Sequence, residues 1–302
     1  MTFRVSIVIP SLNAPTIEAT LQSLYRQTAA LSIAEILVVG LDNQQLIQAH
    51  PLLKWISTQR PVSAAVARNI GIRCAKSDWI AFIDADCIAA ADWLEQLIAA
   101  ATSQHLIIGG SVIIASPNQW TFADNLAMFH SLVPSLPATT RTALPTLNLL
   151  IARSVIDHVG LLDERFMGAA GEDFDWTLRM HQSGYTLQFA PRAQIHHRPA
   201  RGNLASLMVH SWKSGYNMNI VRQRYATYYP ASKIFQYPFL LQALAPLIGL
   251  ITAVKIVARA NLGRRSIHVL PKIWLAKTAW CLGAALQAAI IARSGKKPDS
   301  TI

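Results

Sequence analysis

The chain has 302 residues, of which 52% are hydrophobic and 14% charged, and its formal net charge is +11. This composition is apolar for a soluble protein but too charged for a many-pass membrane protein, and the length suits one large α/β domain with an appendage. The three cysteines lie far apart in the sequence, so they form neither a disulfide framework nor a metal-like pair and fit a reducing compartment.

The positive charge is concentrated in the last third of the chain. Residues 1–200 contain 13 Lys and Arg against 15 Asp and Glu, whereas residues 201–302 contain 14 against one. A basic tail can bind nucleic acid or an anionic membrane surface. The run 234–254 has no charge over a length close to that of a membrane span, which favours the membrane and argues against nucleic acid.

The first part of the chain alternates predicted strands and helices. The N-terminal "RVSIVIPSLN" is predicted to be a first strand rather than a signal peptide, because Pro10 breaks its apolar run. The elements that follow are a helix at 16–28, a strand at 34–40, a helix at 61–77, a strand at 78–86, a helix at 90–103 and a strand at 105–115. This order predicts an α/β fold with a mostly parallel sheet and helices on both of its faces.

The pattern weakens after the last of these strands. Four prolines within residues 117–146 predict a mobile loop. The expected elements beyond it are a helix at 203–225, the uncharged run 234–254, a basic connector at 255–272 and a second apolar run at 273–292.

Asp84 and Asp86 follow the apolar strand "WIAFI" one residue apart. Ligands of parallel sheets bind beyond the carboxyl ends of the strands, which is where this pair falls. One acid could face a ribose while the other binds a divalent cation whose shell is completed by phosphate oxygens. The alternative interpretation is an ordinary solvated turn.

A second acidic cluster, "GEDFD" at 171–175, begins a predicted helix. Acids at a helix N-terminus complement the helix dipole, which accounts for Glu172 or Asp175 without any function. A carboxylate in this cluster could instead deprotonate an acceptor hydroxyl. The paired histidines of "AQIHHRPA" follow a short predicted strand, and one of them is predicted to be a metal ligand, although surface residues would look the same.

Taken in order, these segments resemble the glycosyltransferases of family 2. The resemblance covers about residues 3–225 and rests on "VSIVIPSLNAPTIEATLQSLYRQT", "PVSAAVARNIGI", "DWIAFIDADC", "LNLLIARSVIDHVGLLDERF", "GEDFDWTLRMHQSGY" and "IHH". It implies a GT-A fold over residues 1–230, with a nucleotide-sugar half at 1–115, an acceptor half at 116–230 and a helical, membrane-associated tail at 231–302.

The resemblance also implies roles for the acidic residues. Asp84 and Asp86 match the family's Asp-x-Asp motif, with Asp86 on Mn²⁺ or Mg²⁺ and Asp84 on the ribose or sugar side and as a further metal ligand. Asp173 matches the base that activates the acceptor hydroxyl. The histidine of the metal site is expected to be His196, with His197 as the alternative.

Nucleotide contacts are implied at Pro10, Ser11 and Asn13 after the first strand and at Arg68 of the "ARNIG" segment, with Glu172 as a further substrate contact. One departure concerns the second strand. Family members commonly have "VVDDGS" there, with an aspartate that holds the base, whereas this chain has "VVGLDN". Asp42 is displaced from that position and is the candidate to replace the missing aspartate.

The sequence therefore predicts an inverting, metal-dependent glycosyltransferase that moves a sugar from a nucleotide diphosphate sugar to a glycan or lipid-linked acceptor in cell-envelope glycan synthesis. The alternatives are a nucleotide-sugar nucleotidyltransferase and an inactive membrane-bound scaffold of the same fold. The expected location is the cytoplasmic face of the cell membrane, with basic residues on anionic head groups.

Overall fold

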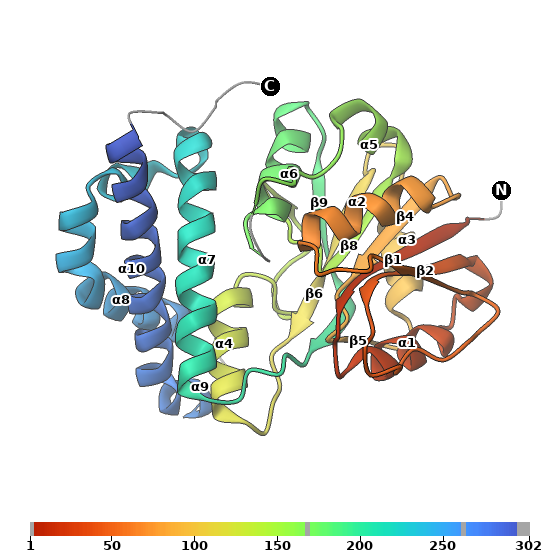
Figure 1. Cartoon of the computed structure of the whole chain (residues 1–302), viewed down its shortest axis with the longest axis horizontal. Helices are drawn as coiled ribbons and strands as arrows, with labels where there is room; N and C mark the ends of the chain where they lie inside the picture. The colour runs from red at the N-terminus through yellow and green to blue at the C-terminus, as the bar shows by residue number, and fades with distance from the viewer. Residues whose placement is uncertain (1–2, 167–169, 261–263, 295–302) are drawn as a thin grey trace. The chain divides into compact units, whose positions relative to one another are not determined.

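The computed structural model describes residues 3–166, 170–260 and 264–294. The chain divides into two compact units, of which the first comprises residues 1–113 and 132–199 and the second residues 114–131 and 200–302. The first unit contains the β-sheet and the second is helical (Figure 1). The domain boundary near residue 230 stays a prediction.

The described residues of the first unit form a nine-stranded sheet in the order β3-β2-β1-β4-β8-β6-β9-β5, with β7 paired to β9. The strands are β1 Val5–Leu12, β2 Ile33–Leu41, β3 Leu53–Ser57, β4 Trp79–Ile83, β5 Cys87–Ala89, β6 Ile107–Ile113, β7 Thr140–Arg141, β8 Asn148–Ala152 and β9 Leu187–His197. Strands β3, β2, β1 and β4 run parallel, as do β6 and β9. The other pairings are antiparallel, so the sheet is mixed, with its longest pairings parallel as predicted.

Helices cover the sheet because its central strands are apolar on both faces. All five residues of β8 are buried, as are the first five of β1 and the last four of β4. The helices of this unit are α1 Ile17–Tyr25, α2 Ala64–Cys74, α3 Trp93–Ala100, α5 Arg153–Val159 and α6 Glu172–Gln182, with a 3₁₀ turn η1 at Ala30–Ser32. Helix α2 packs against β1 and β2, and α3 against β6 and β9. The predicted α/β class is confirmed.

The carboxyl ends of the parallel strands meet at one edge of the sheet. Ser11 of β1 is paired with Gly40 of β2, and β4 ends directly before Asp84. Gly40 has φ +141°, and a Cβ atom there would lie 1.8 Å from the Ser11 carbonyl oxygen. The two strands can therefore approach this closely only because residue 40 is a glycine.

The second unit is a group of helices: α4 Gln119–Phe129, α7 Leu204–Arg224, α8 Pro238–Ala260, α9 Arg264–His268 and α10 Leu270–Ser294, with 3₁₀ segments η2 Ala226–Tyr228 and η3 Pro230–Gln236. Helices α7, α10 and α8 lie side by side (Figure 1). A Cβ atom on Gly215 of α7 would lie 1.9 Å from the Trp280 carbonyl oxygen, so α7 and α10 are in close backbone contact.

The structure differs from the sequence predictions, or adds to them, at three places. The segment 117–146 is not a loop throughout, since it contains α4, whose N-terminus is capped by Asn118, and the short strand β7. The segment 255–272, predicted as a basic connector between the two apolar runs, falls mainly in α8, α9 and α10 where it is described, and residues 261–263 lie outside the described residues. Strand β3 was not predicted at all.

Candidate active site

The turn that carries Asp84 and Asp86 joins β4 to β5. It is closed by the Cys87 backbone N–H, which donates to the Asp84 carbonyl oxygen at 3.0 Å. The hydroxyls of Thr16 and Thr20 at the start of α1 donate to the Ala85 carbonyl oxygen at 3.0 and 2.9 Å. Both acidic side chains stay partly accessible while their backbone is fixed, so this turn presents its carboxylates in a defined position.

Arg68 of α2 connects this turn to the second acidic cluster. Its Nη2 lies 2.7 Å from Asp84 Oδ1, and its Nη1 lies 2.9 Å from Glu172 Oε1. The side chains of Arg68 and Glu172 are only 4% and 2% exposed. Burial by itself lowers the pKa of this guanidinium, but the charges of Asp84, Glu172 and Asp173 outweigh it, so the net pKa is raised. The sequence predicted substrate contacts for Arg68 and Glu172, whereas the structure pairs them with each other in the interior.

Asp173 lies in the first turn of α6, where its carboxylate is held by backbone donors. The Phe174 N–H donates to Oδ1 at 2.9 Å, and the Thr146 N–H approaches Oδ2 at 3.4 Å. Burial, together with the neighbouring Glu172 charge, raises the pKa of Asp173 to about 7 against the opposing effect of Arg68. A carboxyl group with a pKa near neutrality can accept a proton and release it again, which is what a general base requires.

The candidate metal ligands lie where β5 pairs with β9. His197 is opposite Cys87, and its Nε2 lies 3.4 Å from Asp86 Oδ2. One ligand atom from each of Asp86, Cys87 and His197 lies within 4.8 Å of the others. Successive residues of a strand point to opposite faces, so His196, which is opposite Ile88, is directed away from Asp86. The geometry therefore favours His197, the alternative, over His196.

The donor set fits a hard divalent cation. Carboxylate oxygens, together with an imidazole nitrogen and phosphate oxygens from a ligand, suit Mg²⁺ or Mn²⁺. Burial raises the pKa of the Cys87 thiol well above its usual value, and the charges of Asp86 and Asp84 add to this. Cys87 therefore stays a neutral thiol beside the site, while Asp86 and His197 offer the ligand atoms.

The predicted nucleotide contacts gather at the ends of β1 and β2. Asn13 has φ +51°, its N–H donates to the Leu41 carbonyl oxygen at 2.8 Å, and its Oδ1 accepts from the Asn43 N–H at 2.7 Å. The Asp42 carboxylate accepts from the N–H groups of the loop after it, at 3.0 and 2.8 Å. Asn13 and Asp42 thus shape the loop that follows β2, and Pro10 and Ser11 lie beside it at the end of β1.

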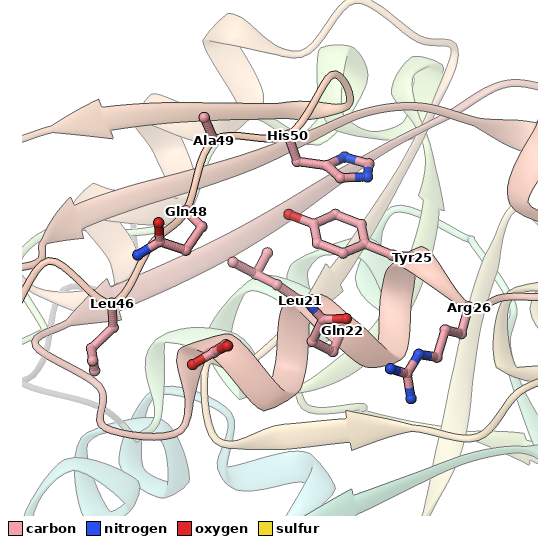
Figure 2. Close-up of a pocket in the computed structure, with 9 residues that line it drawn as sticks. Leu21, Gln22, Tyr25, Arg26, Leu46, Gln48, Ala49 and His50 are labelled. Carbon is pink, nitrogen blue, oxygen red and sulfur yellow. The ribbon is translucent and has the colours of Figure 1, made fainter.

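A pocket on the same unit lies apart from these acids. Its volume is about 340 Å³, and Figure 2 shows it between α1 and residues 46–50. Tyr25 and His50 stack with their ring centroids 3.7 Å apart. The pocket is lined by none of Asp84, Asp86 and Asp173, so it is not the candidate active site.

Two features of this site, the Thr146 N–H and the choice of histidine, could not be found from the sequence. The Thr146 backbone N–H beside Asp173 leaves no trace in the sequence, because any residue except proline supplies that donor. The preference for His197 follows from strand register, which two adjacent histidines do not reveal.

The chain belongs to glycosyl transferase family 2, whose family profile matches residues 6–158. It is similar to glycosyltransferase AglE of Haloferax volcanii, with 29% identity over 62% of this chain and 64% of AglE. It is also similar to the succinoglycan biosynthesis protein ExoM of Rhizobium meliloti, with 28% identity over 68% of this chain and 70% of ExoM. The match to AglE thus spans slightly less than two thirds of that relative's length.

Solved structures share the fold. The mannosyltransferase PcManGT of Pyrobaculum calidifontis, in complex with GDP-Man and Mn²⁺, superimposes with a TM-score of 0.61 at 18% identity and covers 95% of this chain and 87% of its own. GalNAc-T7 with UDP, GalNAc and Mn²⁺ gives a TM-score of 0.55 at 18% identity over 77% of this chain and 51% of its own. The GT-A-like fold implied by the sequence is confirmed.

Replacement of Asp173 should reveal its raised pKa in the pH dependence of stability. Because the folded-state pKa lies above the unfolded value of about 4, the folded state binds more protons between about pH 4 and 7 and loses stability as the pH rises through that window. Asp173→Asn does not titrate, so its melting temperature should exceed that of the wild type by more at pH 8 than at pH 5.

Thermal unfolding followed by circular dichroism measures this difference, at roughly 2–4 °C for each kcal/mol. Asp78→Asn, at an exposed aspartate of the same unit, is the matched control. A gap between Asp173→Asn and wild type that is equal at both pH values would contradict the raised pKa.

Proposed function

We propose that the chain transfers a sugar from a nucleotide diphosphate sugar to an acceptor hydroxyl with inversion at the anomeric carbon. The observation that carries the proposal is the position of Asp173, a carboxylate with a pKa of about 7 linked through Glu172 and Arg68 to the Asp-x-Asp turn. Membership of family 2 and the nucleotide sugar named in the PcManGT complex support this donor class.

Asp173 serves as the general base in this mechanism. It stays partly accessible, and its two backbone hydrogen bonds fix the carboxylate while an acceptor hydroxyl approaches. The neighbouring carboxylate, Glu172, is buried and accepts from Arg68 and from the Ala170 N–H. Of the two acids at the start of α6, Asp173 is thus the one open to an acceptor. A single base, with no nucleophile assigned among the described residues of the site, implies one in-line displacement and hence inversion.

The diphosphate leaving group requires positive charge beside it. Asp86 and His197 would hold Mn²⁺ or Mg²⁺, with Asp84 adjacent, and the bound cation would neutralise charge that develops on the diphosphate. The Thr16 and Thr20 hydroxyls keep this turn in place, so the ligands need little reorganisation on binding.

Cell-envelope or other glycan synthesis is the proposed setting, and the acceptor is proposed to be a glycan or a lipid-linked sugar. The similarity to a protein named for succinoglycan biosynthesis supports this setting. Incubation with labelled nucleotide sugars separates the candidate activities. A transferase releases free nucleoside diphosphate, a nucleotidyltransferase releases pyrophosphate, and an inactive scaffold releases neither.

Asp173→Asn tests the base. The amide keeps the shape of the side chain but cannot accept the acceptor proton, so transfer should fall by about 10²- to 10⁴-fold while donor binding persists. Transfer is followed by release of nucleoside diphosphate and donor affinity by calorimetry. Asp163→Asn, at an acid of the same unit that pairs with Arg165, is the control. An active Asp173→Asn variant would refute the assignment.

The metal site predicts different behaviour for the two histidines. His197→Ala and Asp86→Ala should weaken Mn²⁺ binding and raise the Mn²⁺ concentration needed for half-maximal turnover by about 10- to 100-fold, while His196→Ala should leave it unchanged. Direct titration with Mn²⁺, followed by electron paramagnetic resonance, measures the affinity without relying on turnover. The reverse order of the histidines would restore His196 as the ligand.

Membrane attachment is proposed through the outer face of α8. Two helices, Pro238–Ala260 and Leu270–Arg293, are long and apolar enough to cross a membrane. Helix α8 buries Leu241, Ala245, Gly249, Ala253, Ile256 and Ala260, and its other face exposes Phe239, Leu240, Leu247, Leu250, Ile251 and Val254. An exposed apolar stripe of this extent is typical of an interaction surface.

The occupant proposed for this stripe is an anionic membrane leaflet. Lys233 precedes the stripe, and Lys255 and Arg259 follow it on the exposed side of the helix. Helix α10 is surrounded differently, since it packs against α4, α7 and α8, and its Lys277 donates to the Ala127 carbonyl oxygen of α4 at 2.7 Å. These contacts favour attachment from one side, at the cytosolic face where nucleotide sugars occur, over a hairpin that crosses.

Leu247→Glu combined with Ile251→Glu should abolish sedimentation with vesicles that contain anionic lipid, because it places charge in the centre of the apolar stripe. Leu31→Glu, at an exposed leucine of the first unit, is the control and should still sediment. Zwitterionic vesicles and raised salt should bind the wild type less. Self-association in light scattering without vesicle binding would identify a second copy of the chain as the occupant of the stripe. Cleavage of residues 255–272 by protease added outside intact cells would establish a hairpin that crosses the membrane.

A further inference from the structure

Arg68 is placed between the two acidic segments of the site. It lies on α2, and its two terminal nitrogens contact carboxylates that are far apart in the sequence, Asp84 at 2.7 Å and Glu172 at 2.9 Å. A guanidinium presents its donors in a fixed plane, so two simultaneous contacts define the relative positions of both partners. The side chain is buried, which leaves little of it to contact a nucleotide.

Glu172 continues this connection into the backbone. Its Oε1 accepts from Arg68, and its Oε2 accepts from the Ala170 N–H at 2.8 Å. Ala170 has φ +142° and Gly171 has φ +95°, and a positive φ is costly for alanine. The Glu172 side chain thus holds the unusual backbone turn from which α6 begins, directly before Asp173.

We propose that Arg68 and Glu172 form a positioning pair that ties the Asp-x-Asp turn to the N-terminus of α6 and orients Asp173 for proton removal from the acceptor. The inference rests on the proposed function and assigns Arg68 and Glu172 a role other than substrate contact. It accounts for a buried ion pair that neither the base nor the metal ligands require.

The charges around Asp173 agree with such a role. Within the described residues, Glu172 and Asp84 raise the pKa of Asp173, and Arg68 lowers it. Removal of Glu172 and removal of Arg68 should therefore shift the pKa of Asp173 in opposite directions. A pair that only stabilised the fold would lower stability without producing this opposed response.

The test is a double-variant cycle with Glu172→Gln, Arg68→Gln and their combination. Each single variant should lower kcat by about 10- to 100-fold through misplacement of the base, with the KM for the donor unchanged. The pKa that defines the acid limb of the pH–rate profile should fall by roughly one unit in Glu172→Gln and rise in Arg68→Gln. Because both changes break one link, the combined variant should be little worse than either single variant.

Arg73→Gln and Glu164→Gln provide a matched control, since they remove a surface ion pair between the same helix and the segment after α5, with an N–O distance of 3.8 Å, and should change neither kcat nor the acid limb. A raised donor KM in Arg68→Gln alone, or additive losses in the combined variant, would overturn the positioning pair and restore a substrate contact.

A second readout does not depend on turnover. Titration of the Asp173 carboxyl carbon by ¹³C nuclear magnetic resonance should show the same opposed pKa shifts in the two single variants. An inactive wild type that gives these shifts would reject the transferase and keep the pair. An active wild type without them would reject the pair and keep the transferase.

Discussion

The site depends on one buried cation among several carboxylates. Asp84, Glu172 and Asp173 approach one another because the turn after β4 and the start of α6 converge, and a group of acids without a counter-charge would be costly to bury. Arg68 supplies that charge from α2, with contacts at 2.7 and 2.9 Å. Burial and the Glu172 charge raise the pKa of Asp173 to about 7, against the opposing effect of Arg68.

The same constraint explains where the parts of the site lie. The Asp-x-Asp turn needs the open edge of the sheet, where carboxylates remain partly accessible, and β4 ends directly before it. The base instead needs a helix start with backbone donors, which the Phe174 N–H supplies. Arg68 lies on a third element, α2, and its side chain contacts both Asp84 and Glu172. The proposed donor and acceptor sides of the site are therefore held by the same residue.

Much of the fold could be predicted from local patterns. Runs such as "VSIVIP" and "WIAFI" predicted β1 and β4, because fully buried strands are apolar at every position. Strand β3 was missed because its five residues are half exposed and lack that pattern. Strand direction cannot be obtained from hydrophobicity, so the antiparallel direction of β8, which is as apolar as β4, could not be predicted.

The site was predictable where one residue type determines its chemistry and unpredictable where register or packing decides. Asp86 could be proposed from its place after a buried strand, but the choice between His196 and His197 depends on which of them is opposite Cys87. The glycine at position 40 looked like a lost base contact. In the structure it is required by the close approach of the Ser11 carbonyl oxygen, so an aspartate would not fit there without a change in the backbone.

The two apolar helices of the second unit show how one sequence pattern can have two physical causes. The apolar 18-residue stretches of these helices have mean hydropathies of 2.0 in α8 and 1.5 in α10. Of these stretches, 28% is buried in α8 and 44% in α10. Helix α10 is apolar largely because it packs against α4, α7 and α8, and it tolerates Lys277 because a backbone carbonyl accepts from it. Among the described residues, the outer face of α8 exposes six large apolar side chains, whereas α10 exposes Leu286 and Ile290. The choice between a crossing hairpin and a surface attachment therefore depends on which face of each helix is already buried, and this evidence assigns the proposed membrane contact to α8.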